Sequence, residues 1–89
     1  MTIKKIGIIG AGTMGHGIAL VAAKAGYDVI LHDIKEDYVK KGLSSVEKFI
    51  DKSVEKGKMT LEDKKQILGR IHGTTTLEDM KDADLVIEA

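Results

Sequence analysis

The chain has no cysteine, no proline and no tryptophan, and each absence removes a class of function. Without cysteine there is no disulfide, no thiolate nucleophile and no zinc site with sulfur ligands, a composition that fits a reducing compartment. Aromatic residues make up only 3% of the chain, which leaves little for stacking on nucleic-acid bases. The lack of proline excludes recognition through proline-rich segments.

A charge excess of either sign and long apolar runs are also absent. Fourteen Lys and Arg residues balance fourteen Asp and Glu residues, whereas a nucleic-acid-binding domain usually carries a basic excess on one face. No apolar run approaches the roughly 20 residues of a membrane-spanning helix, and the first residues lack the features of a signal or transit peptide. We therefore expect a cytoplasmic protein with neither a membrane nor a nucleic-acid partner.

The apolar pattern of the first third of the chain predicts a strand, a helix and a second strand. Residues Ile3–Ile9 are apolar at their end and run into glycines, as a buried strand does. Apolar residues three and four apart predict a helix over Thr13–Ala25, with Gly26 at its end. The continuously apolar centre of Tyr27–Asp33 is typical of a parallel strand covered on both faces.

A helical hairpin over about residues 35–70 follows. Apolar residues at spacings of 4, 3, 4 and 4 predict one long amphipathic helix over Lys35–Lys56, which ends at Gly57. Thr60, with an acid three positions later at Asp63, predicts the N-cap of a second, shorter helix. The hairpin is longer than a minimal crossover between parallel strands, so we expect part of it to project beyond the sheet and to serve a substrate.

The rest of the chain completes an α/β fold. It is predicted to form a strand, a helical turn and a last strand, over Arg70–Thr76, Leu77–Lys81 and Ala83–Ala89. The predicted architecture is a four-stranded parallel sheet in the order 3-2-1-4 with helices on both faces. The apolar residues of the fourth strand would lie on an open edge, where strand addition is favoured. We therefore expect self-association through that strand.

One glycine-rich segment carries the main functional signal. Residues Gly10-Ala11-Gly12-Thr13-Met14-Gly15 fit G-x-G-x-x-G between a strand and a helix, and Asp33 ends the second strand 23 positions after Gly10. In such loops the first glycine permits the turn, the second lets a pyrophosphate approach the backbone, and the third lets the helix pack closely. The free N–H groups of the helix then meet the pyrophosphate. The six loop residues and Asp33 are the candidate cofactor-binding residues.

The acid at Asp33 favours NAD as the cofactor. Its carboxylate would accept hydrogen bonds from the adenosine ribose hydroxyls and would repel the 2′-phosphate of NADP. Two alternatives stay open at this point: FAD, which uses the same fingerprint, and a loop and an acid that serve only the fold. Lys35, two residues after the acid, is interpreted as a solvated charge and not as a phosphate contact.

The remaining titratable residues form no predicted catalytic or metal-binding constellation. His16 is interpreted as a helix-surface residue, His32 as a buried structural residue, and His72 has no acid at an informative spacing. The acidic pairs Glu36-Asp37 and Glu62-Asp63 stand at helix starts, where they complement the helix dipole. Neither a metal-ligand cluster nor a nucleophile–base pair is predicted.

Together these features resemble the start of the NAD-dependent 3-hydroxyacyl-CoA dehydrogenases. The resemblance rests on five features over the whole chain, namely the run Gly10–Ala19, the strand ending at Asp33, the long hairpin, Gly73–Thr76 and Asp84–Ala89. It implies part of an NAD-binding Rossmann domain, with NAD over the glycine loop and the ribose on Asp33. It also implies oxidation of 3-hydroxyacyl-CoA to 3-oxoacyl-CoA in fatty-acid or butanoate metabolism, with the hairpin helping to hold the CoA.

The resemblance also implies one substrate contact and one missing contact in the hairpin. A family lysine that contacts CoA falls at Lys56, while a family serine falls at Phe49. A solvated helix end remains the alternative reading of Lys56.

The family's catalytic machinery has no matching position in the 89 residues. The acid and lysine after the Val-Ile-Glu-Ala strand, the Ser-rich turn, the His–Glu pair and the helical dimerisation domain are all unmatched. Hydride transfer needs the nicotinamide held against the substrate and a base for the hydroxyl proton, so we expect the chain alone to be inactive. A stand-alone NAD-binding or sensing module is the alternative from another class. A 3-hydroxyacid or ketopantoate reductase fits the hairpin poorly.

Overall fold

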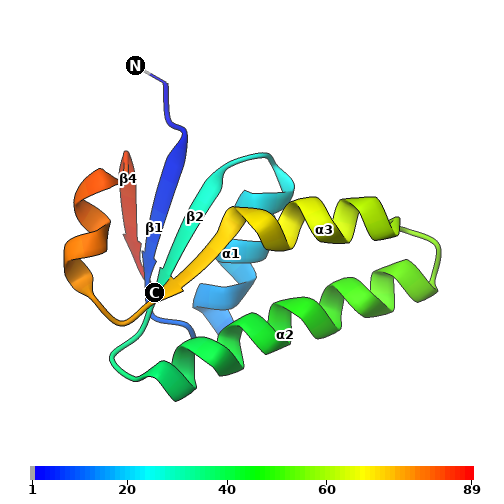
Figure 1. Cartoon of the computed structure of the whole chain (residues 1–89), viewed down its shortest axis with the longest axis horizontal. Coiled ribbons are helices and arrows are strands. Elements are labelled where there is room, and N and C mark those ends of the chain that lie inside the picture. Colours follow the sequence, from blue (N-terminus) through cyan, green and yellow to red (C-terminus); the bar gives the residue numbers. More distant parts are fainter. Residues whose placement is uncertain (1) are drawn as a thin grey trace.

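Strands and helices alternate along the chain, and a computed structural model describes them over residues 2–89 (Figure 1). The elements are β1 (Lys5–Ile9), α1 (Thr13–Lys24), β2 (Asp28–His32), α2 (Glu36–Glu55), α3 (Leu61–Arg70), β3 (Ile71–Thr74), the 3-10 helix η1 (Leu77–Asp82) and β4 (Leu85–Glu88). The four strands are parallel and lie in the order β3-β2-β1-β4. The predicted α/β fold and strand order are confirmed.

The three α-helices cover one face of the sheet, and η1 lies on the other (Figure 1). Ile8 and Leu31, which are fully buried, belong to a core that includes Val46 and Ile50 of α2. On the opposite face a side chain on Gly7 would collide with Met80 of η1. The prediction of helices on both faces is thus confirmed, although the helix on the second face is a short 3-10 helix in the described residues.

The predicted ends of several elements need correction. β1 begins at Lys5 and not at Ile3, because its pairing with β2 begins where Lys5 meets Asp28. The predicted third strand begins at Arg70, but Arg70 is the last residue of α3, which passes directly into β3. Asp33 lies one residue past the end of β2 and is therefore placed at the carboxyl edge of the sheet.

The helices α2 and α3 form a hairpin that extends beyond the sheet (Figure 1), and local residues set where α2 ends and α3 begins. Gly57 adopts a φ of 72° just after α2, a left-handed conformation that favours glycine. The predicted N-cap of α3 is confirmed, since the Thr60 hydroxyl accepts a hydrogen bond from the Asp63 N–H and the Asp63 carboxylate accepts one from the Thr60 N–H, each at 3.0 Å. The hairpin therefore turns where its sequence predicts.

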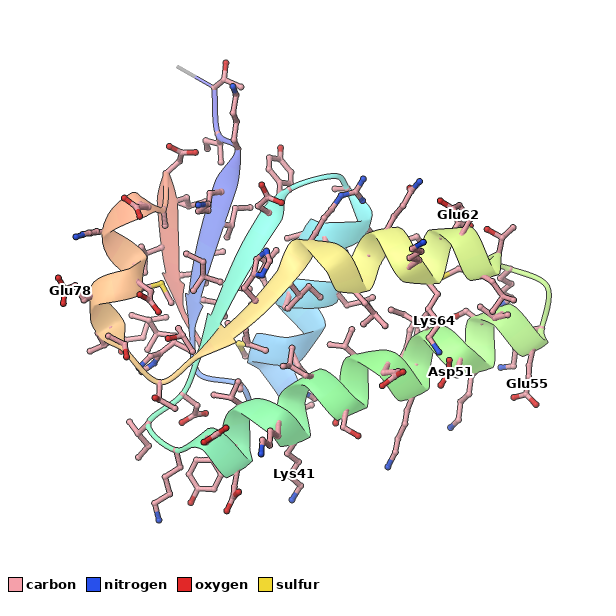
Figure 2. The ribbon with its side chains drawn as sticks, viewed as in Figure 1. Lys41, Asp51, Glu55, Glu62, Lys64 and Glu78 are labelled. Atoms are coloured by element: carbon pink, nitrogen blue, oxygen red, sulfur yellow. The ribbon has the colours of Figure 1, made fainter. Side chains whose placement is uncertain are left out.

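Lys64 ties the two helices of the hairpin together. Its ammonium lies 2.6 Å from the Asp51 carboxylate and 3.4 Å from that of Glu47, so it bridges α3 to α2 (Figure 2). The hydrogen bond to Asp51 is the main reason that the pKa of Lys64 is raised above its usual value. The two carboxylate side chains are half exposed, so the bridge orients the helices more than it stabilises them.

The outer strand β4 is fixed at its start and open at its edge. The Asp84 carboxylate accepts hydrogen bonds from the Lys4 and Lys5 N–H groups, at 2.8 and 3.0 Å, and these bonds lower the pKa of Asp84. Leu85 and Val86 remain 42% and 44% exposed on the edge strand. Among the described residues, none of the helices has the combination of length and apolar character that crossing a bilayer requires.

Candidate dinucleotide-binding site

The glycine loop turns sharply from β1 into α1. Gly10 adopts a φ of 109°, and its N–H donates a hydrogen bond to the His32 carbonyl at 2.7 Å. A Cβ on Gly10 would lie 2.9 Å from the Ala89 carbonyl oxygen, and one on Gly15 would overlap the Gly10 carbonyl oxygen. The first and third glycines therefore have the turning and packing roles predicted for them.

The second glycine faces open space at the start of α1. Among residues 2–89, no atom outside its immediate neighbours lies within 4 Å of the position that a Cβ on Gly12 would occupy. Gly12 is the N-cap of α1, with no side-chain hydrogen bond to the helix end, and the first turn contains no acid. In contrast, α2 and α3 both carry two acids in the first turn. The free N–H groups and positive dipole end of α1 are thus available to an anion.

The half-buried Asp33 carboxylate holds this loop in place. One oxygen accepts a hydrogen bond from the Ala11 N–H at 2.9 Å, and the other accepts one from the Ile34 N–H at 2.7 Å. An ionised carboxylate offers about four acceptor positions. Asp33 therefore keeps acceptor capacity for ribose hydroxyls while it fixes the backbone of Ala11.

A groove of about 290 Å³ lies where the loop, Asp33 and α2 meet. Its lining consists of Ala11, Gly12, Thr13, His16, Asp33, Tyr38, Lys41, Gly42 and Ser45. The structure therefore brings four of the seven sequence-predicted cofactor residues to one groove. Of the other three, Gly10 and Gly15 shape the backbone behind it, and Met14 is 67% exposed at the start of α1.

Sequence reasoning missed the side of this groove that α2 supplies. Tyr38, Lys41, Gly42 and Ser45 follow one another at spacings of 3, 1 and 3, which places them on one face of the helix. A Cβ on Gly42 would lie 2.6 Å from the Ala11 carbonyl oxygen, so glycine lets α2 approach the loop. The helical spacing from Tyr38 was the signal that could have found these residues.

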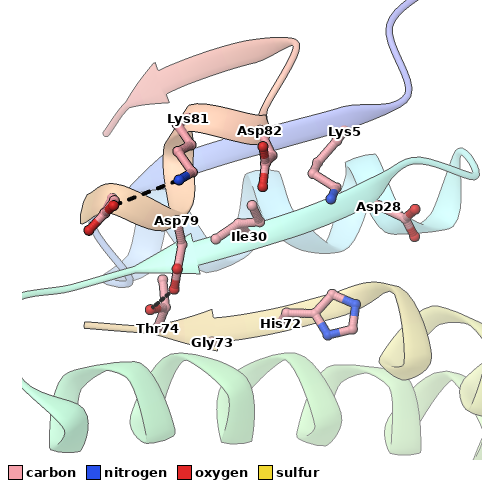
Figure 3. A pocket seen from close by; sticks show the side chains of 10 residues that line it. Lys5, Asp28, Ile30, His72, Gly73, Thr74, Asp79, Lys81 and Asp82 are labelled. Atoms are coloured by element: carbon pink, nitrogen blue, oxygen red, sulfur yellow. Dashed lines mark hydrogen bonds and ion pairs between the residues drawn. The ribbon is translucent and has the colours of Figure 1, made fainter. Parts of the chain in front are cut away.

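The three histidines have different surroundings. His32 is buried, and its Nε2 lies 3.2 Å from the Thr75 carbonyl oxygen, which confirms its structural interpretation. His16 is half-buried at the surface of α1 and lines the groove. His72 is exposed and lines a separate hollow of about 410 Å³ beside η1 (Figure 3). No group of three metal-ligating side chains is present within residues 2–89.

The predicted CoA contact lies far along the hairpin. Lys56 is the exposed C-cap of α2 and lines a hollow of about 290 Å³ together with Lys24, Phe49, Lys52, Ser53, Lys58 and Met59. Lys56 and Phe49, the two positions that the family resemblance singles out, thus belong to one hollow, which four lysines surround.

A parallel sheet in the order 3-2-1-4, with a glycine loop at the first helix and an acid after the second strand, defines a Rossmann-type dinucleotide-binding domain. The sequence profile of the family described as 3-hydroxyacyl-CoA dehydrogenase, NAD binding domain, matches residues 5–89. The chain belongs to this family, and NAD is its cofactor. The match decides against FAD and against the reductases that share only the glycine loop.

Similar proteins cover the whole chain. It is 52% identical over 85 residues to a probable 3-hydroxybutyryl-CoA dehydrogenase of Deinococcus radiodurans, a match that covers 96% of this chain and 30% of that protein. It is 48% identical to the 3-hydroxybutyryl-CoA dehydrogenase of Bradyrhizobium diazoefficiens, covering 97% of this chain and 29% of that protein.

Solved structures agree with the sequence comparison. The (S)-3-hydroxybutyryl-CoA dehydrogenase of Ralstonia eutropha superimposes with a TM-score of 0.97 at 44% identity, over 99% of this chain and 31% of that one. The chain therefore spans about 30% of the length of the relatives that it matches.

Proposed function

We propose that this chain holds the adenosine and pyrophosphate half of NAD in a 3-hydroxyacyl-CoA dehydrogenase, which oxidises 3-hydroxyacyl-CoA to 3-oxoacyl-CoA. The observation that carries the proposal is the open space over Gly12, at a helix start with no cap and no acid, beside Asp33. The names of the relatives support the substrate class. Residues 1–89 are then part of an NAD-binding domain, whose remainder and helical dimerisation domain lie in the other two-thirds of such enzymes.

The residues of the loop divide the work of binding. The first N–H groups of α1, at Thr13 and Met14, hold the pyrophosphate over Gly12, because a helix start attracts anions. Asp33 accepts the ribose hydroxyls, and its bond to the Ala11 N–H keeps the loop in register with the ribose. A bound NAD would supply the acceptor for the hydride of the substrate. No general base for the hydroxyl proton is assigned to this chain.

A titration with NADH tests this proposal. We expect the 89-residue chain to bind NADH without oxidising it when 3-oxobutyryl-CoA is added, because binding and proton transfer are carried by different residues. Binding is followed by the fluorescence of the nicotinamide, and turnover by its absorbance. A chain that does not bind NADH would contradict the proposed site, and one that turns it over would contradict the proposed division of labour.

We propose further that Lys56 contacts the CoA portion of the substrate. Four lysines line the same hollow, a charge that suits the phosphates of CoA. Phe49 has an aromatic ring at the position where the family resemblance places a serine hydroxyl. We expect Lys56→Gln to weaken CoA binding in a salt-dependent way. Lys65→Gln, an exposed change on α3, is the matched control. Equal CoA affinities of the two variants would contradict the contact and show that Lys56 is only a solvated charge at the end of α2.

A second copy of the chain is the proposed protein partner. The exposed apolar side chains of the edge strand β4 support this proposal, since an unpaired edge favours addition of another strand.

A further inference from the structure

The groove is lined by several side chains to which the proposed binding of NAD gives no role. Asp33 lies at the carboxyl edge of the sheet, and Lys41, His16 and Ser45 continue the lining between α1 and α2. Because Asp33 is placed against the ribose hydroxyls in the proposed function, this part of the groove adjoins the ribose 2′-position. The side chains in this part of the groove therefore decide whether a phosphate on the ribose 2′-position can bind.

Lys41 lines the groove and its exposed side chain carries an ammonium without an ion pair among the described residues. Within residues 2–89 its ammonium has no carboxylate within the 4.0 Å of an ion pair, whereas the neighbouring Lys40 lies 3.6 Å from the Glu36 carboxylate. Lys35, the other nearby lysine, lies over the ring of Tyr38 at 5.7 Å from its centre. Figure 2 shows the Lys41 side chain leaving α2 on the side away from α3. Lys41 is thus the lysine of this region that is free to meet an anion.

His16 adds a second group that lacks a partner. Its Nδ1 is buried and has no hydrogen-bond partner among the residues that the structure describes. Buried polar atoms are rarely left unsatisfied, and a ligand in the groove gives this nitrogen a partner when the imidazole ring turns toward it. The Ser45 hydroxyl donates a hydrogen bond to the backbone carbonyl oxygen of Lys41 at 3.0 Å. It therefore does not bind the Lys41 side chain.

We propose that Lys41 and His16 form a subsite for a phosphate monoester beside Asp33, so that the charge of Asp33 alone excludes the 2′-phosphate of NADP. The inference rests on the proposed function, because it takes the ribose position from it. A lysine binds phosphate as a point charge, and a histidine adds an N–H donor. A carboxylate in the same groove repels that phosphate and cancels the attraction. Removing the carboxylate charge uncovers the subsite.

The decisive variant is Asp33→Asn, alone and combined with a change of Lys41. The amide keeps a carbonyl oxygen for the Ala11 N–H but has no charge. We expect Asp33→Asn to tighten NADPH binding by at least about tenfold, the scale of one charge-assisted hydrogen bond. Adding Lys41→Gln should abolish this gain, and adding His16→Ala should reduce it. Adding Lys48→Gln, an exposed change two turns along the same helix, should leave the gain intact.

Two further measurements separate the possible failures. Wild-type NADH binding reports the proposed function, while adenosine 2′,5′-bisphosphate compared with ADP reports the subsite without any nicotinamide. A gain of equal size with and without Lys41→Gln, or no gain in Asp33→Asn, overturns the subsite while the NADH site stands. Circular dichroism melting checks the fold of each variant, and Asp33→Ser replaces Asp33→Asn if the latter does not fold.

Discussion

The glycines of the loop differ in what a methyl group would meet, and this difference separates folding from binding at the scale of single residues. A Cβ on Gly15 would overlap the Gly10 carbonyl oxygen, whereas one on Gly12 or Gly17 would meet nothing within 4 Å. Three glycines that look equivalent in the sequence thus have different roles: the fold needs Gly15, whereas the space at Gly12 is open to a ligand.

The first prediction contrasts two glycines of α1. Gly15→Ala should lower the free energy of unfolding by about 1–3 kcal/mol, because the helix must move away from the loop. Gly17→Ala should raise it by about 0.5–1 kcal/mol, since alanine is the better helix former and the space is open. Urea denaturation measures both. Equal effects of the two changes would contradict the packing role of Gly15.

The sequence predicts the groove residues of the glycine loop and Asp33, but it does not predict those of α2. The glycines and Asp33 follow a spacing whose physical reasons are known, so they could be predicted from letters alone. The second task of Asp33, which is to hold the Ala11 N–H, and the presence of Lys41 in the groove could not. The hydrogen bond of Asp33 depends on the path of the glycine loop beside the end of β2. The place of Lys41 depends on how α2 is rotated about its axis, and the contact of α2 with the loop at Gly42 fixes that rotation.

At the scale of elements, β4 is joined to β1 by a carboxylate as well as by the strand ladder. The pKa of Asp84 is lowered from its ordinary value of 3.8 because the Lys4 and Lys5 N–H groups donate to the ionised form. The folded state therefore binds a proton less readily than the unfolded chain does. The stability from this contact is complete above the unfolded pKa and is lost as the pH falls through the lower folded value.

This linkage gives the second prediction. Asp84→Asn should lower the melting temperature by a few degrees at about pH 6, and the difference from wild type should shrink as the pH falls below about 3.8. Thermal melts over a pH series measure it. Asp82→Asn, which removes an exposed charge on η1 two residues away, is the control. A difference that persists unchanged to low pH would show that the amide disrupts β4 in another way.

The whole molecule is thin, with extents of 37 × 33 × 17 Å. One face of its sheet is packed against three helices, and β4 forms an apolar edge of the described sheet (Figure 1). Strand order and helix placement follow from alternating elements and right-handed crossovers, so they were predictable at this scale. The exposure of Leu85 and Val86 follows from the same topology.

The third prediction concerns this edge. Wild type should self-associate with rising concentration in sedimentation experiments, and Val86→Lys should shift it toward monomer because a charged edge resists strand addition. Leu77→Lys removes a similarly exposed apolar side chain from η1, away from the edge, and should leave the association unchanged. A monodisperse monomer across the concentration range, or equal effects of the two changes, would contradict association through β4.

The most direct test of the central claim is NADH titration of wild type, Gly12→Ala and Gly17→Ala side by side. Within the described part of the chain, a methyl group at Gly12 meets no atom beyond its two chain neighbours, so a loss of affinity reports the space that the pyrophosphate needs. We predict that Gly12→Ala stays folded, with only the small loss of stability that alanine brings to an N-cap, but binds NADH at least about tenfold more weakly, the effect of losing an anion's close contact with the helix start. Gly17→Ala should bind like wild type. Wild-type affinity in Gly12→Ala would contradict the assignment of the glycine loop as the pyrophosphate site.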